Sequence, residues 1–157
     1  MSVFQDFKSY EISKLEYLYR LLFDRGISAV FIYRLSNWCY MHKLTFLAIL
    51  LKHFNIIVNH CEVAYQAEIG QGFRIYHAIG IVIAKCEIGE NFKIFQNSTI
   101  GTAPKIGNNV TFFAGSVVNG FINIGNNVQV GANTVVLKDM QDNSKALGGK
   151  TQFLDVK

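Results

Sequence analysis

One apolar residue in every six marks the C-terminal half of this chain. Nine consecutive positions at this spacing are apolar, and eight of them are isoleucine or valine: Ile88, Ile94, Ile100, Ile106, Phe112, Val118, Ile124, Val130 and Val136. A second set, Ile69, Ile75 and Ile81, keeps the period and joins the first after one extra residue near Glu87. A helix requires a period of 3.6 and a strand a period of 2, so a period of six fits neither alone. It indicates a coil of short strands joined by tight turns, in which each apolar residue stacks on the one below.

The hexads also carry a second inward position and recognisable corners. Three hexads, about 18 residues, close one triangular turn, so residues 69–141 predict about four turns of a mainly β, parallel β-helix. Asn-Asn pairs at 108–109 and 126–127 suit corners with left-handed backbone angles, which asparagine tolerates. Four residues after each rung, the second inward position is small or apolar at most steps: Phe73, Ile79, Phe92, Ser98, Val110, Ser116, Ile122, Val128 and Thr134.

The N-terminal part of the chain has a helical pattern instead. It contains no proline and a single glycine, Gly26. Apolar residues recur at helical spacing in 15–22 and 27–38, and the run 44–58 is apolar almost all round. We predict two or three helices, broken near 24–26, that cap the first open edge of the coil.

This pattern gives three regions: a helical region at 1–60, the β-helix at 61–141, and a C-terminal tail at 142–157 that packs on the last turn. An alternative for residues 44–58 is contact with a membrane surface. Four turns also leave apolar faces uncovered, so we expect self-association into a symmetric oligomer.

Composition narrows the class of protein. Half of the residues are hydrophobic and 17% are charged, which is typical of a globular domain. The net charge of +4 favours anionic ligands such as phosphates, and no cluster of basic and aromatic residues indicates nucleic acid. Three cysteines without CxxC spacing, Cys39, Cys61 and Cys86, are expected to be buried thiols, and no zinc-ligand spacing is present. With no signal-peptide core, we expect a cytoplasmic protein, with peripheral contact at the inner face of the membrane as the alternative.

The hexads ending in Val-Gly-Ala-Asn-Thr-Val-Val-Leu-Lys-Asp, at 130–139, resemble those of left-handed β-helix acyltransferases. The stretch 67–83, with His77 in Ile-Tyr-His-Ala, and the segment 87–91 are similar to the serine acetyltransferase branch. The helical segment Tyr-Arg-Leu-Ser-Asn-Trp, at 33–38, resembles that of capsule and exopolysaccharide O-acetyltransferases. The resemblance covers roughly residues 28–149. It implies a left-handed coil, a homotrimer, acetyl-CoA as co-substrate without a metal, and direct attack by an acceptor hydroxyl.

His77 is the predicted catalytic base. It follows the rung Ile75 by two residues, in neither inward position, so its imidazole should point out of the coil. Imidazole is well suited to take a hydroxyl proton near neutral pH. The resemblance places Glu62 where the family has an aspartate that orients this histidine, and a solvated charge at the helix-to-coil junction is the alternative.

Other site residues follow from the same resemblance. Tyr76 and Phe95 could stack on a sugar face, or they simply pack on the surface. The residues matched to coenzyme binding are small ones that let a pantetheine arm approach the backbone, or lysines near its phosphates: Gly101, Ala114, Gly115, Ala132, Lys138 and Lys150, with Lys145 as a further candidate. Each small residue also suits a tight coil, and each lysine could merely be solvated.

Two departures from serine acetyltransferases decide the predicted acceptor. The segment 100–107 passes directly into the next hexad, without the family's long loop and its second histidine, and Tyr76 replaces an aspartate. These changes favour a bulky neutral acceptor, so we expect an O-acetyltransferase acting on a sugar hydroxyl of a surface polysaccharide or its precursor. The alternatives are a serine O-acetyltransferase of cysteine biosynthesis and a non-catalytic scaffold. A carbonic anhydrase is excluded because it needs several outward histidines, and only His77 lies in the coils.

Overall fold

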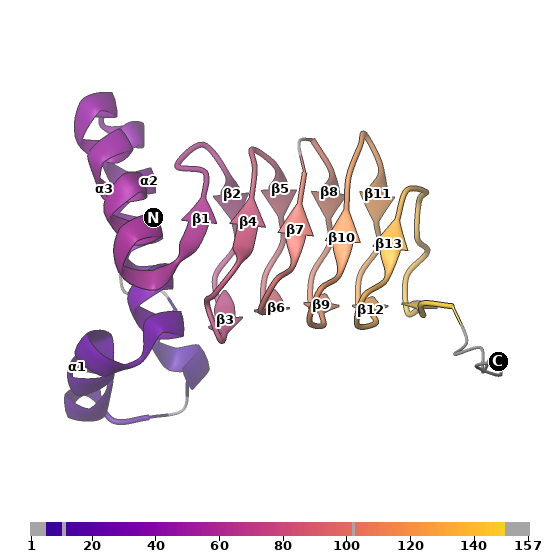
Figure 1. Cartoon of the computed structure of the whole chain (residues 1–157), viewed down its shortest axis with the longest axis horizontal. Helices are drawn as coiled ribbons and strands as arrows, with labels where there is room; N and C mark the ends of the chain where they lie inside the picture. The colour runs from indigo at the N-terminus through magenta and orange to yellow at the C-terminus, as the bar shows by residue number, and fades with distance from the viewer. Residues whose placement is uncertain (1–5, 11, 102, 150–157) are drawn as a thin grey trace, which may run out of the picture.

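Three parallel β-sheets form the walls of a solenoid of about five turns (Figure 1). The structure is a computed structural model that describes residues 6–10, 12–101 and 103–149. Each of the first four turns contributes one strand to each of sheets A, B and C in that order, and the last turn contributes strands to sheets A and C. Each strand therefore pairs with the strand one turn away. The predicted parallel β-helix is therefore confirmed, and it begins one strand earlier than the hexads suggested, at Cys61.

The strands are two or three residues long. Sheet A contains β1 (Cys61–Val63), β4 (Ile81–Ile83), β7 (Thr99–Ile100), β10 (Val117–Val118) and β13 (Val135–Val136). Sheet B contains β2 (Glu68–Ile69), β5 (Glu87–Ile88), β8 (Lys105–Ile106) and β11 (Asn123–Ile124). Sheet C contains β3 (Arg74–Tyr76), β6 (Lys93–Phe95), β9 (Thr111–Phe112), β12 (Gln129–Val130) and β14 (Lys145–Ala146). Because β14 pairs with β12, the predicted C-terminal tail in part continues the solenoid.

The predicted rungs fill the interior of the prism. The nine rungs from Ile88 to Val136 are all buried, and like residues stack between turns. Phe73 stacks on Phe92 with ring centroids 5.8 Å apart, and Phe92 meets Phe112 edge-on at 5.3 Å. The inward hydroxyl of Ser98 donates to the carbonyl of Phe113 at 3.0 Å, so this buried polar position is satisfied.

The extra residues in the hexad series lie in one corner. Ile75 pairs with Ile94 and Ile83 pairs with Ile100, so eight residues separate two successive rungs where the next turn has six. Ile83 and Ile88 then follow at a spacing of five. The predicted position of the extra residue, near Glu87, was wrong, because the insertion lies in the corner at 76–80. Its consequence is that Ile81 is buried and Ile79, predicted to point inward, is exposed.

Three helices close the first end of the solenoid: α1 (Lys14–Phe23), α2 (Arg25–Met41) and α3 (Thr45–Asn59). Ser13 and Asp24 cap α1 and α2 by accepting backbone N–H groups. α3 runs directly into β1, and Figure 1 shows all three helices at the end of the molecule opposite β13. A short 3₁₀ turn, η1 (Phe7–Tyr10), precedes them.

Polar side chains of α2 hold the first turn. The Tyr33 hydroxyl donates to the carbonyl of Ala67 at 2.8 Å, and the Asn37 amide donates to Tyr65 at 2.9 Å. The Arg34 guanidinium donates to the carbonyls of Ile69 and Gly70, each at 2.6 Å, and forms a buried ion pair with Asp6 at 2.7 Å. These contacts explain why α2, a helix predicted from its apolar spacing, also buries polar side chains.

Candidate active site

His77 lies in the enlarged corner between β3 and β4. Its backbone has a φ of 55°, in the left-handed region, and Gly80 in the same corner has a φ of 73°. The left-handed conformation costs a non-glycine residue about 1–2 kcal/mol, and such strain often accompanies functional sites. The imidazole is exposed and hydrogen-bonds to no other residue in the described part of the chain. The ring is therefore free to meet a ligand.

A cavity of about 380 Å³ opens beside this corner. One wall is the segment from Ile75 to Ile79, and the other is the junction of α1 and α2, from Phe23 to Gly26. Gly26 allows this close approach, because a Cβ there would clash with the carbonyl oxygen of Ile75. The junction brings two opposite charges, Asp24 and Arg25, to the same cavity as His77. Sequence reasoning missed both, because only the docking of α2 on β3 brings them near the corner.

Glu62 lies on β1, beside Val82 of β4. Its carboxylate forms an ion pair with Lys52 of α3 at 2.7 Å. No hydrogen bond joins Glu62 to His77 in the described structure. The arrangement matches the expected charge at the helix-to-coil junction, and its role in orienting His77 stays a prediction.

An aromatic row runs beside the corner on sheet C. Tyr76 stacks on Phe95 with ring centroids 4.7 Å apart, and Phe95 stacks on Phe113 at 5.5 Å. The Tyr76 hydroxyl accepts a hydrogen bond from Arg74 at 3.3 Å. The two predicted substrate residues are thus brought together, and Phe113 extends the row by one turn.

The chain passes from sheet C to sheet A along one edge of the solenoid. We call it the C-to-A edge, and its residues include His77, Gly80, Asn97, Gly115 and Asn133. Two of the predicted small residues, Ala114 and Ala132, lie open on this edge. Ala114 is half-buried and Ala132 is exposed. Gly115 has a φ of 71° and leaves no room for a Cβ beside the Asn133 side chain, so the coil itself requires this glycine. On the same edge, the buried Oε1 atom of Gln96 has no hydrogen-bond partner among the described residues.

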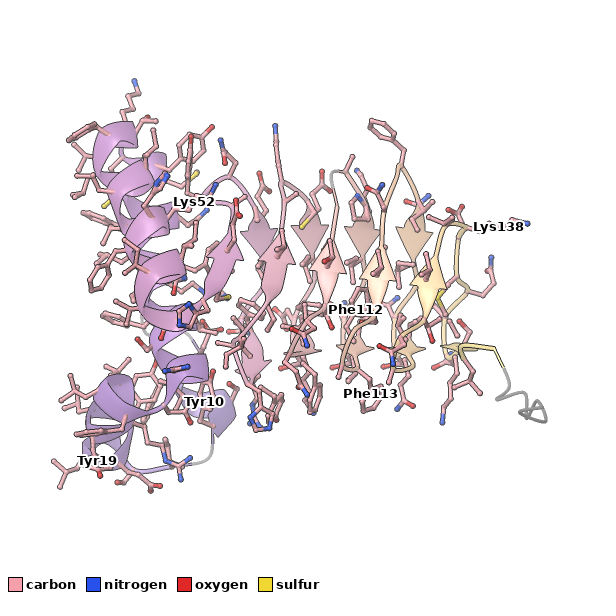
Figure 2. The ribbon with its side chains drawn as sticks, in the orientation of Figure 1. Tyr10, Tyr19, Lys52, Phe112, Phe113 and Lys138 are labelled. Carbon is pink, nitrogen blue, oxygen red and sulfur yellow. The ribbon has the colours of Figure 1, made fainter. Side chains whose placement is uncertain are left out.

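The remaining predicted coenzyme residues are spread more widely. Gly101 follows β7 at the corner between sheets A and B, where a Cβ would meet the Asn119 side chain. Figure 2 shows Lys138 at the end of the solenoid opposite the helices, and its side chain is exposed. Lys145 is exposed on β14, and Lys150 lies outside the described residues.

A larger groove of about 910 Å³ lies on sheet B, between β-strand residues and the end of α2. Trp38 and His42 form one wall, and Glu68, Glu87 and Lys105 lie on the other. None of the predicted site residues lines it, so we place the candidate site at His77. Over the described residues, no group of three or more metal-ligating side chains comes together.

The relatives of the chain agree with this architecture. The family model described as bacterial transferase hexapeptide (six repeats) matches residues 103–138. A Helicobacter pylori protein named serine acetyltransferase is 35% identical over 143 residues, which cover 85% of this chain and 84% of that protein. The chain belongs to the serine acetyltransferase family.

Other members of the family are longer than this chain. The Bacillus pumilus serine acetyltransferase is 33% identical over 141 residues, and the chain covers 65% of its length. A solved serine acetyltransferase in complex with CoA superposes with a TM-score of 0.75 at 29% identity, over 77% of this chain and 53% of that structure. The fold expected from the resemblance is confirmed. The expected nearer likeness to capsule and exopolysaccharide enzymes gains no support from these relatives.

Proposed function

We propose that the protein is an acetyl-CoA-dependent O-acetyltransferase in which His77 is the general base. The observation that carries the proposal is the unpartnered imidazole of His77 at the rim of a cavity that also presents Asp24 and Arg25. Membership of the serine acetyltransferase family supports the reaction class.

The proposed chemistry is a direct transfer. Acetyl-CoA would supply an activated thioester. His77 takes the proton of the acceptor hydroxyl as its oxygen attacks the acyl carbon, and the imidazolium then gives that proton to the departing thiolate of CoA. The new ester bond replaces the thioester bond, so no acyl-enzyme is needed.

The C-to-A edge is the proposed binding place for the pantetheine arm. Ala114 and Ala132 leave its surface open. Neighbouring turns of a sheet are about 4.8 Å apart, so this edge extends away from His77 in regular steps. Lys138 and Lys150 remain candidates for the phosphates by resemblance alone.

L-Serine is the acceptor that we favour. The carboxylate of Asp24 suits the ammonium group of a zwitterion, and the Arg25 guanidinium suits its carboxylate. Asp24 already accepts hydrogen bonds from Gly26 and Ile27 through Oδ1, at 2.9 and 3.2 Å, which fixes its position on the cavity wall. Relatives named serine acetyltransferase support the same acceptor.

A sugar hydroxyl is the second candidate. The row of Tyr76, Phe95 and Phe113 beside the corner favours it, because stacked aromatic rings present an apolar face to a sugar. The short connection from Ile100 to Lys105, at the corner between sheets A and B, does not contain the long loop of the serine enzymes. A non-catalytic scaffold would show neither turnover nor affinity for CoA.

A homotrimer is the proposed assembly. The outward positions on β4, β7, β10 and β13 carry no charge, whereas those of sheet B begin with Glu68, Glu87 and Lys105. Another copy of the chain could therefore cover sheet A from β4 to β13 without removing charged side chains from water, which would be unfavourable.

Thiol release from acetyl-CoA tests the reaction and the acceptor together. We would compare L-serine with capsule or O-antigen oligosaccharides, using wild type, His77→Asn and a matched control, His60→Asn. His60 is also exposed and left-handed, with a φ of 53°, and asparagine tolerates that conformation at both sites. We expect His77→Asn to lose about 10²- to 10⁴-fold in turnover and His60→Asn to lose none.

Asp24→Asn separates the two acceptors. Asparagine is also a good helix cap, so the fold should survive while the negative charge is removed. A raised KM for serine supports the zwitterion site, and turnover with oligosaccharide alone favours the sugar. Turnover that is indifferent to residue 77 would contradict the proposal.

A further inference from the structure

Helix α1 presents its apolar stripe to solvent. Residues at helical spacing on one side are exposed, and their exposed fractions reach 80% at Leu15 and Leu22. Among the side chains of α1 that the structure describes, only Tyr17, on the opposite side, is buried. An ordinary surface helix turns such a stripe toward the interior. The exposed members are Leu15, Leu18, Tyr19, Leu22 and Phe23.

Helix α3 also turns its apolar side to solvent. Its outward stripe contains Phe46, Leu50, Phe54 and Ile57, with Phe46 76% and Ile57 72% exposed. Its buried residues are Ala48, Asn55 and Asn59. The inner side is therefore held by hydrogen bonds: Asn55 donates to the carbonyl of Ala29 at 3.1 Å, and Asn59 donates to Asn55 at 2.8 Å. A helix that buries amides and exposes phenylalanine needs a partner for its outer side.

Both stripes lie at the same end of the molecule. Figure 1 shows α1 and α3 beyond the first turn of the solenoid, and Figure 2 shows Tyr19 of α1 at the end opposite Lys138. No described helix is long and apolar enough to cross a membrane. An apolar helix face of this kind can lie in the interface of a bilayer without crossing it.

The charge at this end identifies the partner. From Arg25 to Cys61 the sequence contains no aspartate or glutamate, while Lys43, His53 and His60 are exposed around α3. Two nearby carboxylates have ion-pair partners, since Glu16 pairs with Arg20 at 2.8 Å and Glu62 pairs with Lys52, and a third, Asp24, adjoins Arg25. A second copy docking face to face would place the exposed Lys43 side chains of both copies in one interface. An anionic lipid surface would complement them.

We propose that the outward faces of α1 and α3 form a docking surface for an anionic phospholipid bilayer. The apolar side chains enter the headgroup boundary, and the basic groups meet lipid phosphates. Phe23 belongs both to this surface and to the wall of the His77 cavity, so docking brings that cavity to the membrane.

Vesicle flotation tests the proposal without reference to catalysis. The probes are vesicles of phosphatidylcholine alone and of phosphatidylcholine mixed with phosphatidylglycerol. We expect at least tenfold stronger binding to the mixed vesicles. The variant Phe54→Glu/Ile57→Glu should lose at least tenfold in binding, and Lys43→Glu about fivefold.

Phe121→Glu is the matched control, because Phe121 is 91% exposed between β10 and β11, away from the helices. Its binding should equal that of wild type, and circular dichroism checks that each variant is folded. Absence of binding by wild type, or equal binding by all variants, would overturn the proposal. An oligomer that Phe54→Glu/Ile57→Glu dissociates, without vesicle binding, would assign the surface to a second copy instead.

Discussion

Single residues in left-handed backbone conformations make the corners of this solenoid. One corner of the solenoid repeats an asparagine with φ between 55° and 58°, at Asn91, Asn109, Asn127 and Asn143. Each side-chain amide donates to the next asparagine, at 3.1, 3.1 and 2.9 Å. The corner thus joins a strained conformation to a hydrogen-bonded column.

Asn109 allows the two contributions to be separated. Asn109→Ala should lower the free energy of unfolding by about 1–2 kcal/mol or more, because alanine pays the left-handed cost and loses both hydrogen bonds. Asn109→Gly loses the same hydrogen bonds but adopts the angle freely, so its loss should be smaller. Urea denaturation measures both, and equal losses would show that backbone strain is unimportant here.

The buried cysteines should be chemically silent. Burial, together with the smaller effect of the neighbouring carboxylates of Glu62 and Glu87, raises the pKa of the Cys61 and Cys86 thiols to about 12. Unfolded thiols ionise near 8.5, so the stability that these groups contribute is intact below that pH and declines as pH rises toward 12. At pH 8 we expect no reaction of either thiol with Ellman's reagent until denaturant is added. Rapid labelling of the native protein would contradict their burial.

Residue spacing predicted the stacked rungs but not the detail of the His77 corner. Ile79 and Ile81 are both apolar and two residues apart, so either could occupy the inward slot. Only strand pairing shows that Ile81 takes it and that the insertion lies around His77. The sequence did not place Asp24 and Arg25 in the site for a related reason, because the His77 corner that they meet is about 50 residues away in sequence.

At the scale of elements, the junction between α2 and the first turn of the solenoid is polar. Helical spacing predicted two or three helices and the break near 24–26, because apolar periodicity and caps are local signals. It did not predict which side faces inward. Arg34 and Asp6 are each 1% exposed and bind backbone groups of β2 and Phe73, contacts that no periodicity encodes.

Removal of this buried pair should be costly. Arg34→Ala leaves Asp6 buried without its cation, and we expect a loss of about 3–5 kcal/mol in the free energy of unfolding. Arg20→Ala is the control, because the Arg20–Glu16 pair is exposed and such pairs contribute about 0.3–0.5 kcal/mol. Thermal and urea denaturation compare the two, and similar losses would show that the Asp6–Arg34 pair does not hold the helices to the solenoid.

At the scale of the whole molecule, the uncharged outward column of sheet A from β4 to β13 is the feature that predicts assembly. Val135→Glu places a charge on that column, so it should shift a trimer toward monomers. Gln129→Glu, on the outward side of sheet C one corner earlier, should leave the trimer intact. Size-exclusion chromatography with light scattering measures the mass. A trimer unaffected by Val135→Glu would place the interface on another face.

The regular pairing of turns has a consequence for how such a chain can change. From β7 onward, each strand of sheet A meets a strand 18 residues further along, with side chains in the same register. Removal or duplication of one such segment would therefore preserve every remaining contact type. The number of turns sets how far the alanine-lined edge reaches from His77. That reach can be lengthened or shortened in whole turns without changing the corner that holds His77.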